Sequence, residues 1–346
     1  MPDTTVQTST GAAAVPDPVE PPSRRKRLPL ARLRDFALVP AIIAIALVGE
    51  AINPVFLHFQ NIVTILQAMS EVGLMVLAEM MILLVGRMDL SLESTFGLAP
   101  GIAAWLTIAP GVSHGLGWLG GAWAVPICLL VGAIIGATNG LLIVRFRLHG
   151  FVVTLGMLIV LRGLLNGISG GETFFDLPSS MTWLGQAVWF SVPVEVWLCL
   201  ALFAVAIFVM GYTRWGRALY AVGGNADAAK AAGIRTDRIV WIVLIIGSVL
   251  AALGGLMLSG RLASVPASQG SGDIFTVFAA AVIGGVSLRG GKGTVFGAFT
   301  GVLLLYMIQN VLTLAGVAAQ WQDFLNGVVI LAALIISRVT SGQEQE

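Results

Sequence analysis

Several polar and ionisable side chains interrupt long apolar stretches of this 346-residue chain. The stretch 62–86 alone contains Gln67, Ser70, Glu71 and Glu79. In a helix with a step of about 100° per residue, Gln67 and Glu71 share a face, and Glu79 lies about 80° from Glu71. Side chains of this kind either bind a polar molecule or join neighbouring helices through hydrogen bonds.

At membrane depth, ionisable groups usually face a cavity or a partner, because exposing one to lipid costs at least about 2.5 kcal/mol. Amides, hydroxyls and carboxylates along such a cavity would suit a hydroxyl-rich solute. The alternative for each residue is a hydrogen bond between helices, worth well under about 2 kcal/mol. The candidates for lining such a polar route are Gln67, Glu71, Asp89, Asn139, Thr154, Asn166, Gln309 and Asn310.

The residue types that most often catalyse reactions or bind metals do not form a site in the sequence. His58, His114 and His149 are far apart, and no HExxH or paired Cys/His spacing occurs. Cys128 and Cys199 each lie within an apolar run, which excludes a disulfide framework and a cysteine zinc site. We therefore expect no metal, no cofactor and no catalytic site.

A glycine-rich segment at 285–294 partly matches a phosphate-binding loop. The match fails twice, because Val286 replaces the first glycine of the motif and Lys292 is followed by Gly293 rather than Ser or Thr. The segment also follows an apolar stretch instead of opening a soluble α/β unit. We interpret it as a tight cytosolic turn that contains Gly284, Gly285, Arg289, Gly290, Gly291, Lys292 and Gly293.

Apolar residues make up 57% of the chain and charged residues only 11%, whereas a soluble domain carries roughly a quarter charged residues. The composition therefore predicts an all-α integral membrane protein. A window of about 19 residues, which crosses roughly 30 Å of hydrocarbon, indicates about ten transmembrane helices. They are approximately 36–52, 62–86, 93–109, 121–144, 151–169, 188–211, 239–260, 272–288, 294–313 and 321–338. The span 272–288 is short and can alternatively be read as re-entrant.

The basic residues predict the orientation of these spans. With a cytosolic N-terminus and ten spans, all basic residues except Arg162 and Arg261 fall within or beside the cytosolic segments. Both termini are then cytosolic and the chain is a multi-pass protein of the cytoplasmic membrane; eight spans are the alternative. Residues 1–35 are expected to be a disordered tail with a basic cluster, 36–338 the membrane domain, and 339–346 a short tail.

Two segments form a weak parallel internal repeat. Both 85–101 and 283–301 contain V/I-G followed by F-G-x-x-x-G. The copies are six spans apart, so they would run in the same direction through the membrane, as parallel repeats do in many transporters. The alternative is that the F-G-x-x-x-G motif only packs helices.

The longest expected cytosolic loop, 212–238, contains a short helix signal. Asn225 is a suitable helix cap, Asp227 lies in the expected first turn and Gly233 is a stop signal. A small-sided helix at 226–232 would suit insertion into a groove of another protein, and the alternative is a solvated connector. The residues of interest are Gly224, Asn225, Ala226, Asp227, Ala228, Ala229, Gly233 and Ile234.

Four stretches make the chain similar to a known family: Met88-Asp-Leu-Ser91, Thr154-Leu-Gly-Met157 with Arg162-Gly163, the loop 223–234, and the segment 281–294. The chain resembles the permease subunits of bacterial ATP-binding-cassette importers for simple sugars, of the ribose, xylose, arabinose and galactose type. The likeness covers residues 62–338, and it implies the fold of vitamin B12 importers.

The resemblance implies a permease that carries a monosaccharide or similar small polyol by alternating access. The implied partners are a second permease chain, identical or paralogous, a cytosolic ATP-binding-cassette ATPase and an extracytoplasmic sugar-binding protein, with no nucleic acid. The loop 224–234 would be the coupling helix that fits the ATPase, and ATP would be hydrolysed by that partner alone. The alternative function is a secondary transporter driven by an ion gradient, with Glu71, Glu79 and Asp89 as its ion-binding groups.

The turn at 85–94 departs from the family. The family usually has Thr-Gly-Gly-Ile-Asp-Leu-Ser-x-Gly-Ser, whereas this chain has Arg87 and Glu93 at two of the small positions. If that turn affects gating or substrate passage, the departures indicate a shift within the family's range of substrates.

Overall fold

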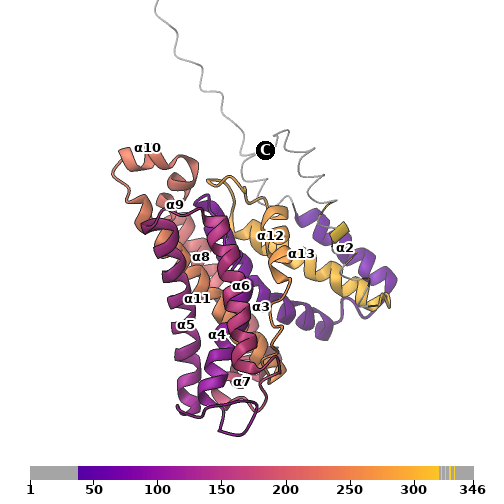
Figure 1. Ribbon diagram of the computed structural model, residues 1–346. Coiled ribbons are helices and arrows are strands. Elements are labelled where there is room, and N and C mark those ends of the chain that lie inside the picture. Colours follow the sequence, from indigo (N-terminus) through magenta and orange to yellow (C-terminus); the bar gives the residue numbers. More distant parts are fainter. Residues whose placement is uncertain (1–37, 319–320, 322–323, 325–326, 329–330, 332–346) are drawn as a thin grey trace, which may run out of the picture.

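The computed structural model describes residues 38–318, 321, 324, 327–328 and 331. The tails predicted at 1–35 and 339–346 lie outside these residues, as does most of the predicted span 321–338. The described part is mostly helical, as the composition predicts, with one small strand pair (Figure 1).

The structure describes the following elements in chain order. The helices are α2 (Val39–Ile52), α3 (Phe59–Leu84), α4 (Leu92–Thr107), a 3-10 turn η1 (Gly121–Trp123), α5 (Ala124–Gly140), a π-turn η2 (Leu141–Arg145), α6 (Gly150–Ser169), α7 (Ser179–Gln186), α8 (Val194–Tyr212), α9 (Arg214–Gly224), α10 (Ala226–Ala231), α11 (Thr236–Leu262), α12 (Asp273–Ile283) and α13 (Val295–Leu314). Strands β1 (Val188–Trp189) and β2 (Val192–Pro193) pair antiparallel.

Six helical segments in the described part are long and apolar enough to cross a membrane. They are Phe59–Leu84, Gly121–Arg145, Gly150–Ser169, Val194–Tyr212, Thr236–Leu262 and Val295–Leu314. The other predicted spans that the structure describes also contain apolar helices, but α2, α4 and α12 have only 14, 16 and 11 residues. The membrane character is therefore clear, whereas the number of crossings is not fixed by helix length.

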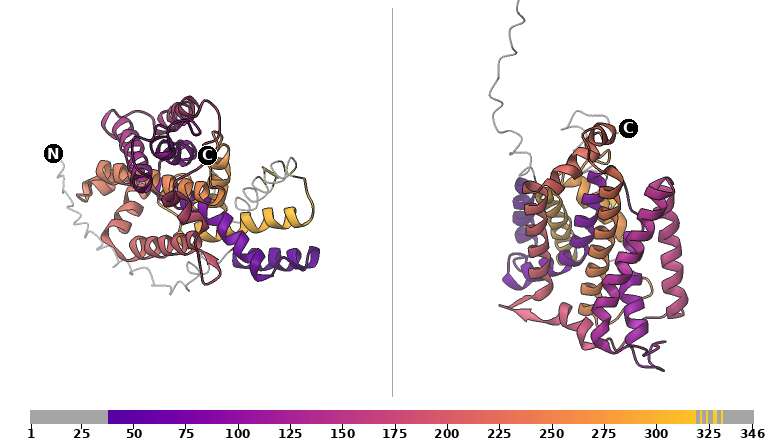
Figure 2. Two further views of the ribbon diagram at one scale, coloured as in Figure 1. Left: turned by 90° about the horizontal axis from the view of Figure 1, so that it is seen from below. Right: turned by 90° about the vertical axis from the view of Figure 1, so that its left-hand side faces the viewer.

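Helix α3 forms the centre of the molecule. Every residue from Met69 to Leu84 is buried, because α11, α12, α13 and α8 surround this half of the helix. Apart from Ser70, Glu71 and Glu79, this half of the helix is apolar on all sides, as is expected in an interior position. Helix α11 packs against α3, α4 and α5, while α2 packs on α13 at the side of the molecule (Figures 1 and 2).

The two ends of the helix bundle differ. Helices α9 and α10 lie at one end, called here the α10 end, and α7 lies at the opposite end (Figures 1 and 2). The strand hairpin directly follows α7 and contacts the start of α8, so it belongs to the α7 end. Two backbone hydrogen bonds between Phe174 and Val265 join the loop after α6 to the loop after α11.

Two local predictions differ from the structure. The predicted span 188–211 begins with the hairpin instead of a helix, because Phe190 and Ser191 adopt positive φ angles of 52° and 63° that end helical geometry. Residues 214–224, which were expected to be part of the cytosolic loop 212–238, form helix α9. It forms because Gly216, Leu219 and Val222 bury one face against the bundle.

Candidate functional site

Helix α10 has the local structure that the sequence predicts. The Asn225 side chain accepts a hydrogen bond from the Ala228 backbone N–H at 2.9 Å, which caps the first turn. Gly233 ends the segment with a φ of +84°, a conformation that suits glycine. Most of the helix surface is exposed, and Ala229 is its buried residue. The helix therefore exposes its other alanines, together with Asp227 and Lys230, at the α10 end.

The glycine-rich turn contacts the segment that leads into α10. We call Gly86, Gly223, Gly224, Gly290 and Gly291 the glycine junction, where three connections meet. The Gly291 backbone N–H donates to the Leu84 carbonyl at 2.9 Å. Added Cβ atoms would lie 2.9 Å from Gly86 Cα at Gly290 and 2.6 Å from Gly291 N at Gly223. The junction thus joins the ends of α3 and α9 to the turn after α12 by backbone contact.

One hydrogen bond extends the glycine junction. Tyr220 of α9 donates from its hydroxyl to the Gly293 carbonyl at 2.8 Å. The turn itself closes through the Ser287 backbone N–H, which donates to the Lys292 carbonyl at 2.9 Å. These two bonds therefore connect α9 to the turn between α12 and α13.

Asp89 and Asn139 lie together in a buried cluster beside the turn after α3. The Asp89 carboxylate accepts from the Ser91 N–H at 2.9 Å, the Ser91 hydroxyl at 2.6 Å and the Asn139 amide at 3.1 Å. Burial raises the pKa of Asp89, and the donors of Ser91 and Asn139 partly offset this. The cluster fixes the turn between α3 and α4 onto α5.

Glu71 is paired with a residue that the sequence analysis did not select. Arg261 of α11 donates from Nε at 2.5 Å and from Nη2 at 3.0 Å to the two Glu71 carboxylate oxygens. Glu71 is almost fully buried, whereas the Arg261 side chain is 36% exposed. The signal that identifies Arg261 is an ionisable residue at the end of a long apolar helix.

A second buried carboxyl group lies close to this ion pair. Glu195, in the first turn of α8, interacts electrostatically with Glu71 and Arg261, and Gln67 faces its carboxyl group. Both Glu195 carboxylate oxygens are buried. Gln67 and Glu71 thus meet at one polar centre between α3, α8 and α11, as their shared helix face predicts.

Glu93, which replaces a small residue of the family pattern, makes polar contacts with two other segments. Its Oε1 lies 3.7 Å from the Arg162 guanidinium, and its Oε2 accepts from the backbone N–H of Gly272 at 3.1 Å. Arg162 additionally donates to the Gln269 carbonyl at 2.7 Å. Gln269, which the sequence analysis missed, donates to the carbonyls of Phe96 and Gly255 at 3.0 Å each. These contacts connect α4, α6 and α11 to the segment before α12.

The remaining candidates for the polar route do not lie at the polar centre of Gln67, Glu71 and Glu195. Asn310 exchanges hydrogen bonds with Asn61 at 2.9 and 3.0 Å, which joins α13 to α3. Thr154 is buried and its hydroxyl donates to the Phe151 carbonyl at 3.3 Å, whereas Asn166 is exposed on α6. Gln309 is half-buried. Helix joining, the alternative reading, therefore accounts for Asn310, and the structure does not bring Asn166 to the other candidates.

No metal centre can be assigned within the described part of the chain. Its His, Cys, Asp and Glu residues form no group of three or more that could hold an ion. The described chemistry is that of ion pairs and hydrogen bonds between helices, together with an exposed helix at the α10 end.

Similarity to known proteins covers most of the chain. Residues 61–334 match the family described as "Branched-chain amino acid transport system / permease component". The autoinducer 2 import system permease protein LsrC of Klebsiella pneumoniae is 35% identical over 307 residues, with 89% of this chain and 87% of the relative covered. The ribose import permease protein RbsC of Escherichia coli K12 is 33% identical over 304 residues, covering 87% and 92%. No solved structure is significantly similar to the chain.

These matches confirm the resemblance to permease subunits of ATP-binding-cassette sugar importers. The match spans nearly all of α3 and every helix from α4 to α13, so it does not depend on one motif. The protein is a membrane permease subunit and not an enzyme. The chain therefore belongs to the family of branched-chain amino acid transport system permease components.

Proposed function

We propose that α10 couples this permease to a cytosolic ATPase and that the permease carries a monosaccharide or similar small polyol. The observation that carries the coupling role is the joint geometry of α10 and the glycine junction. The helix is capped, exposed and small-sided, and backbone contacts connect its base to the end of the central helix α3. A push on α10 would therefore reach the core without passing through flexible side chains.

The proposed substrate class rests on the relatives and on the polar centre. One relative is named as a ribose permease and others as autoinducer 2 permeases, so small hydroxylated solutes are the class to test first. Gln67, Glu71 and Glu195 offer an amide and carboxyl groups, which hydrogen-bond to hydroxyl groups. These residues are the proposed pathway contacts.

The proposed assembly has two permease chains, identical or paralogous, with ATPase subunits at the α10 end and a sugar-binding protein at the α7 end. The α10 end faces the cytosol in this arrangement, which places both termini inside. Ten spans and the fold of vitamin B12 importers are part of the same proposal. The two copies of the repeat support it, since each folds as a helix, a turn and a second helix.

The experiment introduces bulk on the exposed face of α10. Ala228→Trp should prevent insertion of α10 into a partner groove, because the added indole cannot fit where an alanine sits. We expect the ATPase subunit encoded with the permease to be lost on co-purification, and uptake of radiolabelled ribose, or of the sugar that the binding protein prefers, to fall to background.

The matched control is Ala122→Trp, which adds the same side chain to an exposed alanine at the α7 end. This variant should keep the ATPase subunit bound. Unchanged docking and uptake in Ala228→Trp would contradict the coupling role. Uptake that survives ATP depletion but is abolished by an ionophore would instead support a gradient-driven transporter.

A further inference from the structure

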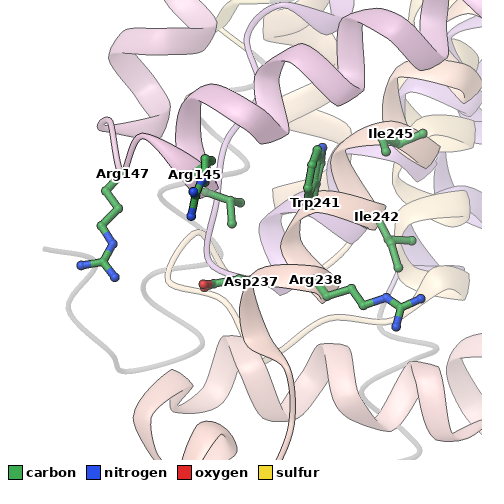
Figure 3. A pocket seen from close by; sticks show the side chains of 8 residues that line it. Arg145, Arg147, Asp237, Arg238, Trp241, Ile242 and Ile245 are labelled. Carbon is green, nitrogen blue, oxygen red and sulfur yellow. The ribbon is translucent and has the colours of Figure 1, made fainter.

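A basic cavity lies at the α10 end, apart from α10 itself. It is partly open and has a volume of about 630 Å³ between the π-turn that follows α5 and the first turns of α11 (Figure 3). Arg145 and Arg147 come from the α5 side, while Arg238 and Trp241 come from α11. The volume falls within the roughly 300–1,000 Å³ of sites for small molecules or head groups.

The arginines of this cavity are available to a ligand. Arg145, Arg147 and Arg238 are exposed, and none forms an ion pair with another residue that the structure describes. Asp237 is the acidic residue of the lining, so the cavity has an excess of positive charge. Guanidinium groups bind phosphate oxygens through paired hydrogen bonds, which indicates a phosphate-bearing ligand.

The surface that leads to the cavity is apolar. Leu130, Ile134 and Leu141 lie on one face of the α5 segment and are 59%, 55% and 39% exposed. Ile242 and Ile245 continue the apolar lining into the cavity itself. An exposed apolar stripe that ends at arginines matches the order of a lipid, with acyl chains followed by a phosphate.

Trp241 is fixed between α5 and α11 at the cavity. Its indole N–H donates to the Ala137 carbonyl at 3.0 Å, and a Cβ on Gly140 would overlap its ring, so the indole is held against α5. Tryptophan is enriched where the hydrocarbon meets the head groups, and basic pockets between membrane helices can bind acidic head groups.

We propose that this cavity binds the phosphate of an anionic phospholipid, with Arg145 and Arg238 attracting it from opposite sides of the cavity and the acyl chains along the α5 stripe. Lipid binding here requires only that this end of α5 and α11 lies at a membrane surface. It therefore does not depend on the coupling role of α10 or on the transported solute.

The experiment measures lipid retention by the full chain. Wild type and variants are reconstituted in nanodiscs of phosphatidylglycerol and phosphatidylcholine, released into detergent, and analysed by native mass spectrometry for bound lipid. Wild type should retain phosphatidylglycerol in preference to phosphatidylcholine. Arg145→Gln and Arg238→Gln should each weaken that retention about fivefold, which corresponds to about 1 kcal/mol per arginine near a charged surface.

Two controls separate charge from folding. Arg214→Gln removes an exposed arginine from the same end but outside the cavity, and should retain lipid as the wild type does. The double variant Arg145→Lys with Arg238→Lys keeps both positive charges and should keep most of the preference for phosphatidylglycerol over phosphatidylcholine. Thermal unfolding in phosphatidylcholine should be equal for all variants.

Two results would overturn the proposal. One is equal phosphatidylglycerol retention in Arg214→Gln and in the glutamine variants of Arg145 and Arg238. The other is displacement of the lipid by an excess of inorganic phosphate, which would identify a site for a soluble anion instead. ATPase co-purification in the same variants tests the coupling proposal separately, because that proposal predicts no loss from Arg145→Gln.

Discussion

Glu71 and Arg261 form an ion pair whose two partners differ in burial. The carboxylate is nearly inaccessible, whereas the guanidinium can reach solvent. Removing the arginine therefore leaves a buried charge without a partner, which is the costly way to break such a pair. Arg261→Met should destabilise the chain by about 2 kcal/mol or more, and Glu71→Gln should cost less. Thermal unfolding in detergent measures both.

The double variant decides whether the cost comes from the unpaired charge. Glu71→Gln combined with Arg261→Met should be more stable than Arg261→Met alone, because the buried carboxylate is gone. Simple addition of the two single effects would contradict this account and would assign the loss to packing.

Asp89 should make stability depend on pH in a defined direction. Burial raises its pKa in the folded chain above the ordinary value of 3.8. The folded chain therefore keeps the Asp89 carboxyl protonated to a higher pH than the unfolded chain does. The resulting stabilisation of the fold is complete below the ordinary pKa of 3.8 and is lost as the pH rises through the folded pKa. Asp89→Asn removes this dependence.

The measurement compares unfolding temperatures of wild type and Asp89→Asn across the range from about pH 4 to neutral. The advantage of the wild type over the variant should shrink as pH rises. A constant difference across the range would mean that Asp89 titrates alike in both states.

Among the connections between helices, the glycine junction offers a sharp comparison between adjacent residues. A Cβ on Gly223 would overlap the Leu84 carbonyl and lie 2.6 Å from Gly291 N, whereas one on Gly224 would meet nothing within 4 Å. Backbone atoms cannot move aside as a side-chain end can. Gly223→Ala should therefore destabilise the chain by about 1–3 kcal/mol, and Gly224→Ala should change stability by less than about 0.5 kcal/mol.

Thermal unfolding of the two variants tests this expectation directly. Both substitutions add one methyl group within α9, so helix propensity favours both alike. Equal unfolding temperatures would mean that the three connections do not touch as closely as described, and the route from α10 to α3 would then lose its physical basis.

Most helices could be predicted from the sequence because a membrane crossing needs a long apolar run. Helices α3, α6 and α13 begin and end within three residues of their predicted spans. The hairpin at 188–193 could not be predicted, since Val188 and Trp189 extend an apolar run and the turn depends on two positive φ angles. Helix α9 is stabilised by tertiary contacts that its glycine-rich sequence does not reveal.

The candidate site was only partly predictable for the same reason. The cap by Asn225 is local and was predicted correctly. The partners of Glu71 and Asn310 lie 190 and 249 residues away in sequence, so residue type could indicate that they need a partner but not which one. The glycine junction likewise joins three connections whose proximity depends on the packing of α3, α9 and α12.

For the molecule as a whole, the central question is which end faces the cytosol. Basic residues gather at the α10 end, including Arg145, Arg238 and the segment around α10. Such residues favour the cytosolic side in membrane proteins. In the proposed orientation, Trp189 and Phe190, the exposed aromatic residues of the hairpin, face the outside of the cell.

Single cysteines at the two ends test this orientation in intact cells. Ala122→Cys, at the α7 end, should react with a membrane-impermeant maleimide added outside, and Ala228→Cys, on α10, should react only after the cells are permeabilised. The native Cys128 and Cys199 are buried, so the unmodified chain supplies the background. Labelling of Ala228→Cys in intact cells would reverse the orientation and place α10 where no cytosolic ATPase can reach it.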